Sequence, residues 1–111
     1  MGLVNLNSSN GINITKDIRN PDTVAAVSAT NTSSVALAAN TNRAGYSIYN
    51  VGPQTVYLRE NATVTAALYK HPIPPGYLFE QDSASSRYTG AISVITATGT
   101  ASLMVSESTL S

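Results

Sequence analysis

The sequence contains no cysteine and no tryptophan, and it has one histidine and one phenylalanine among its 111 residues. Without cysteine the chain can form neither a disulfide framework nor a thiolate metal site. A chain of this length is expected to form one domain, because it can bury about 65% of the surface that its unfolded form exposes. The sequence therefore predicts a single domain with one hydrophobic core and no covalent cross-link.

Charge is also scarce. Charged residues make up 11% of the chain, with six basic residues against six acidic ones, whereas an average domain has roughly 25%. In their place stand 14 serines, 13 threonines and 10 asparagines. A neutral surface has no long-range field to attract nucleic acid or anionic lipid, and the few basic residues are dispersed, so we expect no nucleic-acid partner. It also lacks the net charge that keeps monomers apart in solution, which suits a protein held against a partner.

Long hydrophobic runs are missing as well. No segment approaches the roughly 20 apolar residues that a membrane-spanning helix needs. The first residues, Met1–Asn7, have neither a basic region nor the apolar stretch of a secretion signal. We therefore expect no membrane partner and no signal peptide.

What the sequence does contain is a series of short segments in which apolar and polar residues alternate, separated by turns rich in Gly, Pro and Asn. This pattern predicts an all-β chain, namely a jelly-roll-like β-sandwich of about seven or eight short antiparallel strands, with a barrel as the open alternative. The expected strands span residues 34–38, 45–51, 55–59, 62–69, 77–80, 90–97 and 101–106. The segment 71–76 cannot be a central strand, because its three prolines remove three backbone donors.

The alternation also predicts how individual strands are oriented. Val35 and Leu37 are expected to share one face of their strand, as are Tyr46 and Ile48. Segments 45–51 and 55–59 are expected to form a hairpin, because only a short turn separates them. In the last strand Ala101, Leu103 and Val105 are expected to face inward.

The composition changes near residue 33, which divides the chain into an arm and a domain. Residues 1–32 are expected to form an extended N-terminal arm that packs on the domain or on a partner, and residues 33–111 the sandwich domain. Within the arm, Thr23–Ala29 also allows a short helix. Scattered apolar residues of the arm are candidate partner contacts: Leu3, Val4, Leu6, Ile12 and Ile14.

No catalytic centre is evident, and we expect no enzyme activity, no cofactor and no metal site. His71 has no nearby acidic residue along the chain except Glu80, which follows a proline-rich loop. Glu80 and Asp82 are the one close acidic pair, and a strand would place them on the same face. Glycoside hydrolysis by these two carboxylates is conceivable, but solvated surface residues are the preferred interpretation.

Tyrosines and prolines supply the remaining candidates for a partner surface. Six tyrosines lie on or beside predicted strands, and each can serve either in the core or at an interface. Tyr46 and Tyr49 have opposite parity on one strand, so one of them should point outward, and Tyr49 is the candidate contact. Pro72, Ile73 and Pro74 form a rigid loop that is either a plain connector or a contact element.

Residues 33–106 resemble a pattern found in small virion proteins of phages. The pattern has an Asn-x-x-Arg turn and a strand ending in Asn (Ala39–Asn50), a Val-Tyr strand (Thr55–Leu58), a proline-glycine loop (Pro74–Tyr77) and a Tyr-Thr-Gly-Ala-Ile strand (Tyr88–Ile95). In these motifs, its length and its arm, the chain is similar to the capsid cement or stapling (decoration) proteins of tailed phages. Among them, the staple protein of the epsilon15-like short-tailed phages is the best match.

The resemblance implies a structural protein of the virion. Its partner would be the major capsid protein, which it would bind on the outer capsid surface after synthesis in the host cytoplasm. It would act as a homodimer that bridges neighbouring capsid subunits and stabilises the shell against internal DNA pressure. The alternative is a carbohydrate- or receptor-binding β-module of a phage tail or fibre.

Overall fold

The computed structural model describes residues 19–82 and 87–110. The predicted all-β fold is confirmed, and among the described residues no helix is long and apolar enough to cross a membrane. Within these two ranges the chain forms eight strands: β1 (Thr23–Ala29), β2 (Ser34–Leu37), β3 (Arg43–Pro53), β4 (Val56–Arg59), β5 (His71–Ile73), β6 (Leu78–Gln81), β7 (Ile92–Thr96) and β8 (Ala101–Thr109).

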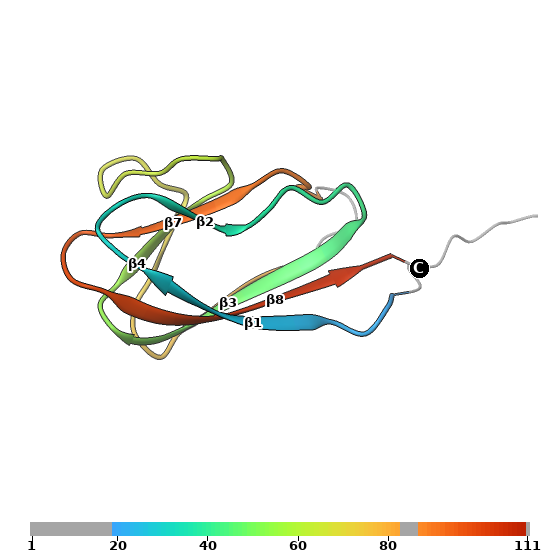
Figure 1. The fold of residues 1–111 in the computed structure, drawn as a ribbon, viewed down its shortest axis with the longest axis horizontal. Coiled ribbons are helices and arrows are strands. Elements are labelled where there is room, and N and C mark those ends of the chain that lie inside the picture. Colours follow the sequence, from blue (N-terminus) through green and yellow to red (C-terminus); the bar gives the residue numbers. More distant parts are fainter. Residues whose placement is uncertain (1–18, 83–86, 111) are drawn as a thin grey trace, which may run out of the picture.

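The strands form two four-stranded antiparallel sheets that pack face to face (Figure 1). One sheet has the order β1-β8-β3-β6 and the other has the order β2-β7-β4-β5. The chain changes sheet at nearly every connection, and the first and last strands lie side by side. This arrangement is that of a jelly roll, as predicted, and it is a sandwich rather than a single closed barrel.

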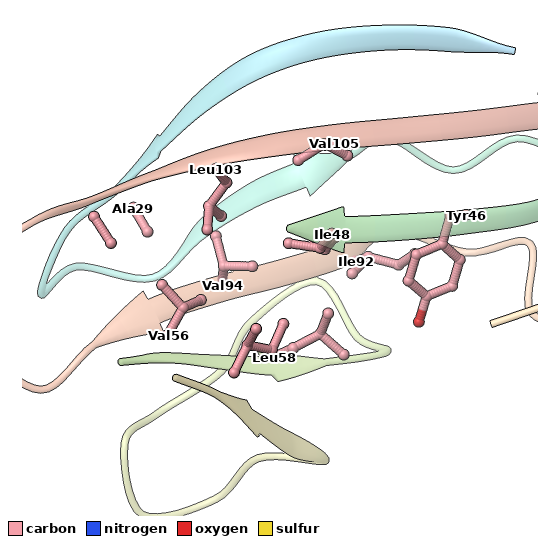
Figure 2. Close-up of a cluster of buried hydrophobic side chains, with 11 residues drawn as sticks. Ala29, Tyr46, Ile48, Val56, Leu58, Ile92, Val94, Leu103 and Val105 are labelled. Atoms are coloured by element: carbon pink, nitrogen blue, oxygen red, sulfur yellow. The ribbon is translucent and has the colours of Figure 1, made fainter. Parts of the chain in front are cut away.

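The hydrophobic core lies between the sheets and follows from the alternation of the strands. In β8 the inward residues Ala101, Leu103 and Val105 are buried, as predicted, while their neighbours Ser102 and Met104 are exposed. Figure 2 shows Leu103 pointing toward Val94 of the opposite sheet. The two-residue period of a strand thus selects one apolar face from each sheet.

The expected hairpin between residues 45–51 and 55–59 does not form. β3 and β4 belong to different sheets, because the chain crosses between them after Gly52, whose φ of 108° suits glycine. The buried Asn50 side chain fixes this crossing: its Nδ2 donates to the carbonyl oxygens of Gln54 and Ile73, both at 2.7 Å, and its Oδ1 accepts from the Gly52 amide at 2.8 Å. A short turn was therefore compatible with a sheet-to-sheet crossing as well as with a hairpin.

Two other expectations about strands were wrong. Val35 and Leu37 do not share a face, because an irregularity lies between them in the pairing with β7, and Val35 is exposed. Residues 62–69 form a loop rather than a strand, since the Thr65 hydroxyl accepts hydrogen bonds from the Ala67 and Leu68 amides and turns the chain locally.

The sandwich begins before residue 33. Residues 23–29, placed in the arm by the composition, form β1, which pairs with β8 at seven successive positions. The alternative of a short helix at this segment is wrong, because pairing with β8 overrides the helix propensity of its alanines. The rest of the predicted arm, residues 1–18, lies outside the described residues.

A buried arginine connects both sheets and explains two motifs of the sequence. Arg43 is only 1% exposed, and its Nε donates to Glu107 Oε2 at 2.7 Å. Its Nη1 donates to the carbonyl oxygens of Tyr88 and Gly90, and its Nη2 to that of Ala38. The Asn-x-x-Arg turn and the Tyr-Thr-Gly segment therefore meet at one guanidinium group, which has a structural role.

Candidate protein-binding surface

Four apolar residues cross the outer face of the β1-β8-β3-β6 sheet in a line. Ala26 pairs with Met104, Met104 with Tyr49, and Tyr49 with Leu78. Directly paired residues project from the same face of an antiparallel sheet, with Cβ atoms about 5 Å apart. The exposed fractions are 42% for Met104, 40% for Tyr49 and 55% for Leu78. We call these four residues the apolar row.

The apolar row is exposed because its strands bury the opposite face. On β3, Ile48 and Asn50 on either side of Tyr49 are fully buried, and on β8 Leu103 and Val105 flank Met104 in the same way. Val51, two positions beyond Tyr49 and also exposed, extends the apolar surface along β3. Contiguous apolar surface of this kind marks binding sites on soluble proteins.

A polar hollow borders the apolar row. Ser47 lies two positions before Tyr49 on β3, and Ser106 lies two positions after Met104 on β8. Their hydroxyls hydrogen-bond to each other, and Ser47 pairs with Glu80 of β6. A concavity of about 170 Å³ opens there, lined in part by Asp22, Asp82 and Ser108. This polar hollow offers hydroxyl and carboxylate groups beside the exposed ring of Tyr49.

Glu80 and Asp82 line the same hollow, as their spacing predicted. Asp82 Oδ1 forms an ion pair with Arg19 Nη1 at 2.6 Å. The ring of His71 lies elsewhere, 4.7 Å from that of Phe79. Across residues 19–82 and 87–110, no group of three or more His, Asp or Glu side chains is placed to hold a metal ion.

The two tyrosines of β3 point to opposite sides, as their parity predicted. Tyr46 is buried, and its hydroxyl donates to Glu60 Oε2 at 3.0 Å. Burial, and next to it the negative charge of Glu60, raises the pKa of the Tyr46 phenol well above its ordinary value. Lys70 also approaches Glu60, at 3.5 Å. Tyr46 is therefore a core residue, and Tyr49 is the surface residue of the pair.

The other tyrosines divide between packing and exposure. Tyr57 of β4 and Tyr69 of the loop that follows β4 lie against each other with ring centroids 4.6 Å apart. Tyr88 packs against the core and donates its hydroxyl to the Ala91 carbonyl oxygen. Tyr77, which directly precedes β6, is exposed. The core role therefore holds for Tyr46 and Tyr88, and an interface role for the exposed tyrosines stays a prediction.

The structure separates the candidate contacts named from the sequence. Pro72 is exposed on the outer face of the second sheet, opposite the face that presents Tyr49, and Pro74 is half-buried. The prediction that Ile73 contacts a partner was wrong. Ile73 is 1% exposed and belongs to the core, because its position in β5 turns its side chain inward. Leu3, Val4, Leu6, Ile12 and Ile14 lie outside the described residues. No single flat partner can therefore contact both Tyr49 and Pro72.

Sequence reasoning missed the other members of the apolar row. Met104 stands between the inward Leu103 and Val105, so alternation alone places an apolar side chain outward there. Leu78 precedes the inward-facing Phe79 and has the same signature. An apolar residue at an outward position was the signal that could have identified Met104 and Leu78 as surface residues. Their alignment with Tyr49 depends on strand pairing, which the alternation does not specify.

The sequence and the fold were compared with known proteins. No family model matches the chain, and no curated protein matches it. One solved structure with a similar fold is described as "Bacillus endospore appendages form a novel family of disulfide-linked pili". It has a TM-score of 0.47 and 14% sequence identity, and the alignment covers 92% of this chain and 100% of that chain.

Proposed function

We propose that this chain is a non-enzymatic structural protein that binds the outer surface of a phage capsid and staples neighbouring major capsid subunits. The observation that supports a binding role is the apolar row, which presents Tyr49, Leu78 and Met104 to solvent on a sheet face. The resemblance of residues 33–106 to phage cement proteins supports the choice of partner. Self-association as a homodimer belongs to this proposal.

The chemistry of the apolar row suits a protein partner. Tyrosine and methionine are enriched at protein interfaces, and charged residues are depleted from interface centres. The four residues of the row are uncharged, so docking requires no desolvation of ions. A partner that covers the row would gain about 25 cal/mol for each Å² of apolar surface removed from water.

Stapling by such a module would be mechanical. A protein that binds only the assembled shell stabilises that state by mass action, in proportion to its occupancy. On a symmetric shell, many weak contacts act together through high effective concentration. The shell would then need more free energy to open under the pressure of its DNA.

Co-sedimentation with assembled capsids that lack this protein tests the proposal. The wild-type chain should bind saturably and raise the resistance of the shells to heat, and Tyr49→Ser combined with Leu78→Ser should reduce binding by more than tenfold. Val35→Ser is the matched control, because Val35 is exposed on the other sheet. Failure of the wild-type chain to bind would refute the proposal, whereas equal binding by the double variant would refute the role of the row.

The arm has its own test. Deleting residues 1–14 should weaken attachment to the shell and leave the sandwich folded, since β1 begins at Thr23. Circular dichroism would verify the fold, and co-sedimentation would measure attachment. A truncated chain that binds as well as the full chain would show that the arm makes no contribution.

The polar hollow supports a second candidate, a carbohydrate-binding module of a phage tail or fibre. The hollow combines hydroxyl and carboxylate groups with the neighbouring ring of Tyr49. A sugar can stack its apolar face on an aromatic ring while its hydroxyl groups bind polar side chains. If the chain is a carbohydrate-binding module, it should bind glycans on an array, and Glu80→Gln should weaken that binding. A chain that binds capsid shells but no glycan would exclude the carbohydrate-binding function.

A further inference from the structure

The four edge strands of the two sheets differ in how well they are protected. β5 has three residues and contains Pro72, β2 has four residues and an irregular pairing, and β6 has four residues with Glu80 at its edge. Short length, proline, irregularity and charge all oppose the addition of a further strand. These three edges are therefore blunted.

β1 has none of these protections. It has seven residues, Thr-Val-Ala-Ala-Val-Ser-Ala, without charge or proline, and its pairing with β8 is regular throughout. The four residues from Thr23 to Ala26 are exposed. An edge strand presents unpaired backbone N–H and C=O groups along its free side, which makes a long, flat, uncharged edge a template for another strand.

We propose that the free edge of β1 pairs antiparallel with β1 of a second copy of this chain, around a two-fold axis at Ala26. All seven residues then find partners: Thr23 faces Ala29, Val24 faces Ser28, and Ala25 faces Val27. Each pair joins residues of equal parity, so the core-facing and outward faces stay continuous across the axis. The two four-stranded sheets become one sheet of eight strands.

The sequence of β1 fits its own copy. A two-fold interface brings each residue and its symmetry mate to the same patch, so a charged residue near the axis would meet its own charge. β1 has no charged residue, and Asp22 just before it would face the neutral Thr30 in this register. The zero net charge of the chain adds no long-range repulsion.

The pairing would also enlarge the apolar row. Ala26 is the end of the row on β1, and Met104, Tyr49 and Leu78 continue it across the sheet. At the two-fold axis Ala26 would stand beside its symmetry mate and join the two rows into one. This inference deepens the self-association within the proposed function, because it specifies the surface and the register.

Engineered cysteines can test the register, because the chain has no cysteine of its own. In the proposed dimer the two copies of residue 26 lie directly opposite each other, about 4.5–5.5 Å apart between Cα atoms, which is within the range of a disulfide. The two copies of residue 28 lie four positions apart along the strands, at least about 13 Å. Ala26→Cys should therefore form a disulfide-linked dimer on mild oxidation, and Ser28→Cys should not.

Sedimentation of the purified wild-type chain should show a concentration-dependent dimer. Ala25→Lys should abolish it while the unfolding midpoint in urea stays within the range of surface variants, because inward-pointing lysines on edge strands block strand addition. A wild-type chain that stays monomeric at millimolar concentration overturns the inference, as does cross-linking of Ser28→Cys to the same extent as Ala26→Cys. A monomer that still binds capsids would refute this dimer alone, whereas a dimer that binds none would refute the capsid role alone.

Discussion

Arg43 shows how one side chain can fix several parts of a sandwich. Its guanidinium group is buried, pairs with Glu107, and donates to three backbone carbonyl oxygens from two connecting segments. Each of these acceptors would lose its partner if the guanidinium group were removed. A buried charge network of this kind is costly to break, because the remaining groups are left unsatisfied.

Arg43→Met should therefore destabilise the fold by about 3–5 kcal/mol. Urea unfolding followed by circular dichroism would measure the loss. Lys70→Met is the matched control: its ion pair with Glu60 is at the surface, with the Lys70 side chain 45% exposed, and should contribute about 0–1 kcal/mol. Equal losses in the two variants would contradict the structural role of Arg43.

Tyr46 predicts a pH dependence of stability. Burial and the neighbouring Glu60 raise the pKa of its phenol, so above about pH 10 the unfolded tyrosine ionises while the folded one stays neutral. The contribution of the Tyr46 phenol to the free energy of unfolding is fully present below that pH and decreases as the pH rises further. The free energy of unfolding should thus decrease more between pH 8 and pH 11 in the wild type than in Tyr46→Phe.

Tyr46→Phe should also lower the free energy of unfolding at neutral pH. Tyr46→Phe loses the hydrogen bond to Glu60, which is worth about 0.5–1.5 kcal/mol. Urea titrations at pH 8 and pH 11 would separate the two effects. Parallel decreases in both proteins would show that Tyr46 does not titrate in this way.

At the scale of elements, β5 shows why a proline-rich segment can still belong to a sheet. It is an edge strand with three residues, and its pairing with β4 places Pro72 opposite Tyr57 and Ile73 opposite Val56. Proline is tolerated on an edge because one side of the strand needs no donor. The sequence correctly excluded a central strand here. It left the loop of Pro72, Ile73 and Pro74 as either a connector or a contact element, and neither role placed Ile73 in the core.

Adjacent residues of β5 should consequently differ in their effect on stability. Ile73→Ala removes a buried side chain and should cost about 2–5 kcal/mol. Pro72→Ala, on the exposed side, should change stability by only about 1 kcal/mol or less, chiefly through the unfolded chain. Similar losses in urea unfolding would contradict the inward orientation of Ile73.

At the scale of the whole molecule, the sandwich has two outer faces with different surfaces. One presents the apolar row beside the polar hollow, and the other presents Pro72, Val35 and the Tyr57–Tyr69 pair. The chain as a whole carries little charge, since 11% of its residues are charged, and on the first face charged side chains line the polar hollow beside the row. Recognition by the apolar row should therefore depend on apolar contact.

Attachment through the apolar row should consequently be insensitive to salt. Between 50 and 500 mM NaCl the affinity for capsids should change by no more than about threefold, because screening weakens only interactions between charges. Co-sedimentation at the two ionic strengths would measure it. A steep fall with salt would indicate that charged groups such as those of the polar hollow dominate binding.

The sequence by itself determined the all-β class, the inward residues of β8 and the opposite directions of Tyr46 and Tyr49, because the two-residue period of a strand is a local property. Only the tertiary structure decided that β3 and β4 belong to different sheets, that β1 is a strand of the sandwich, and that Arg43 is buried. It also aligned Ala26, Met104, Tyr49 and Leu78 in one row. These features depend on which distant strands pair, and pairing is selected by the packing of the whole core rather than by any segment alone.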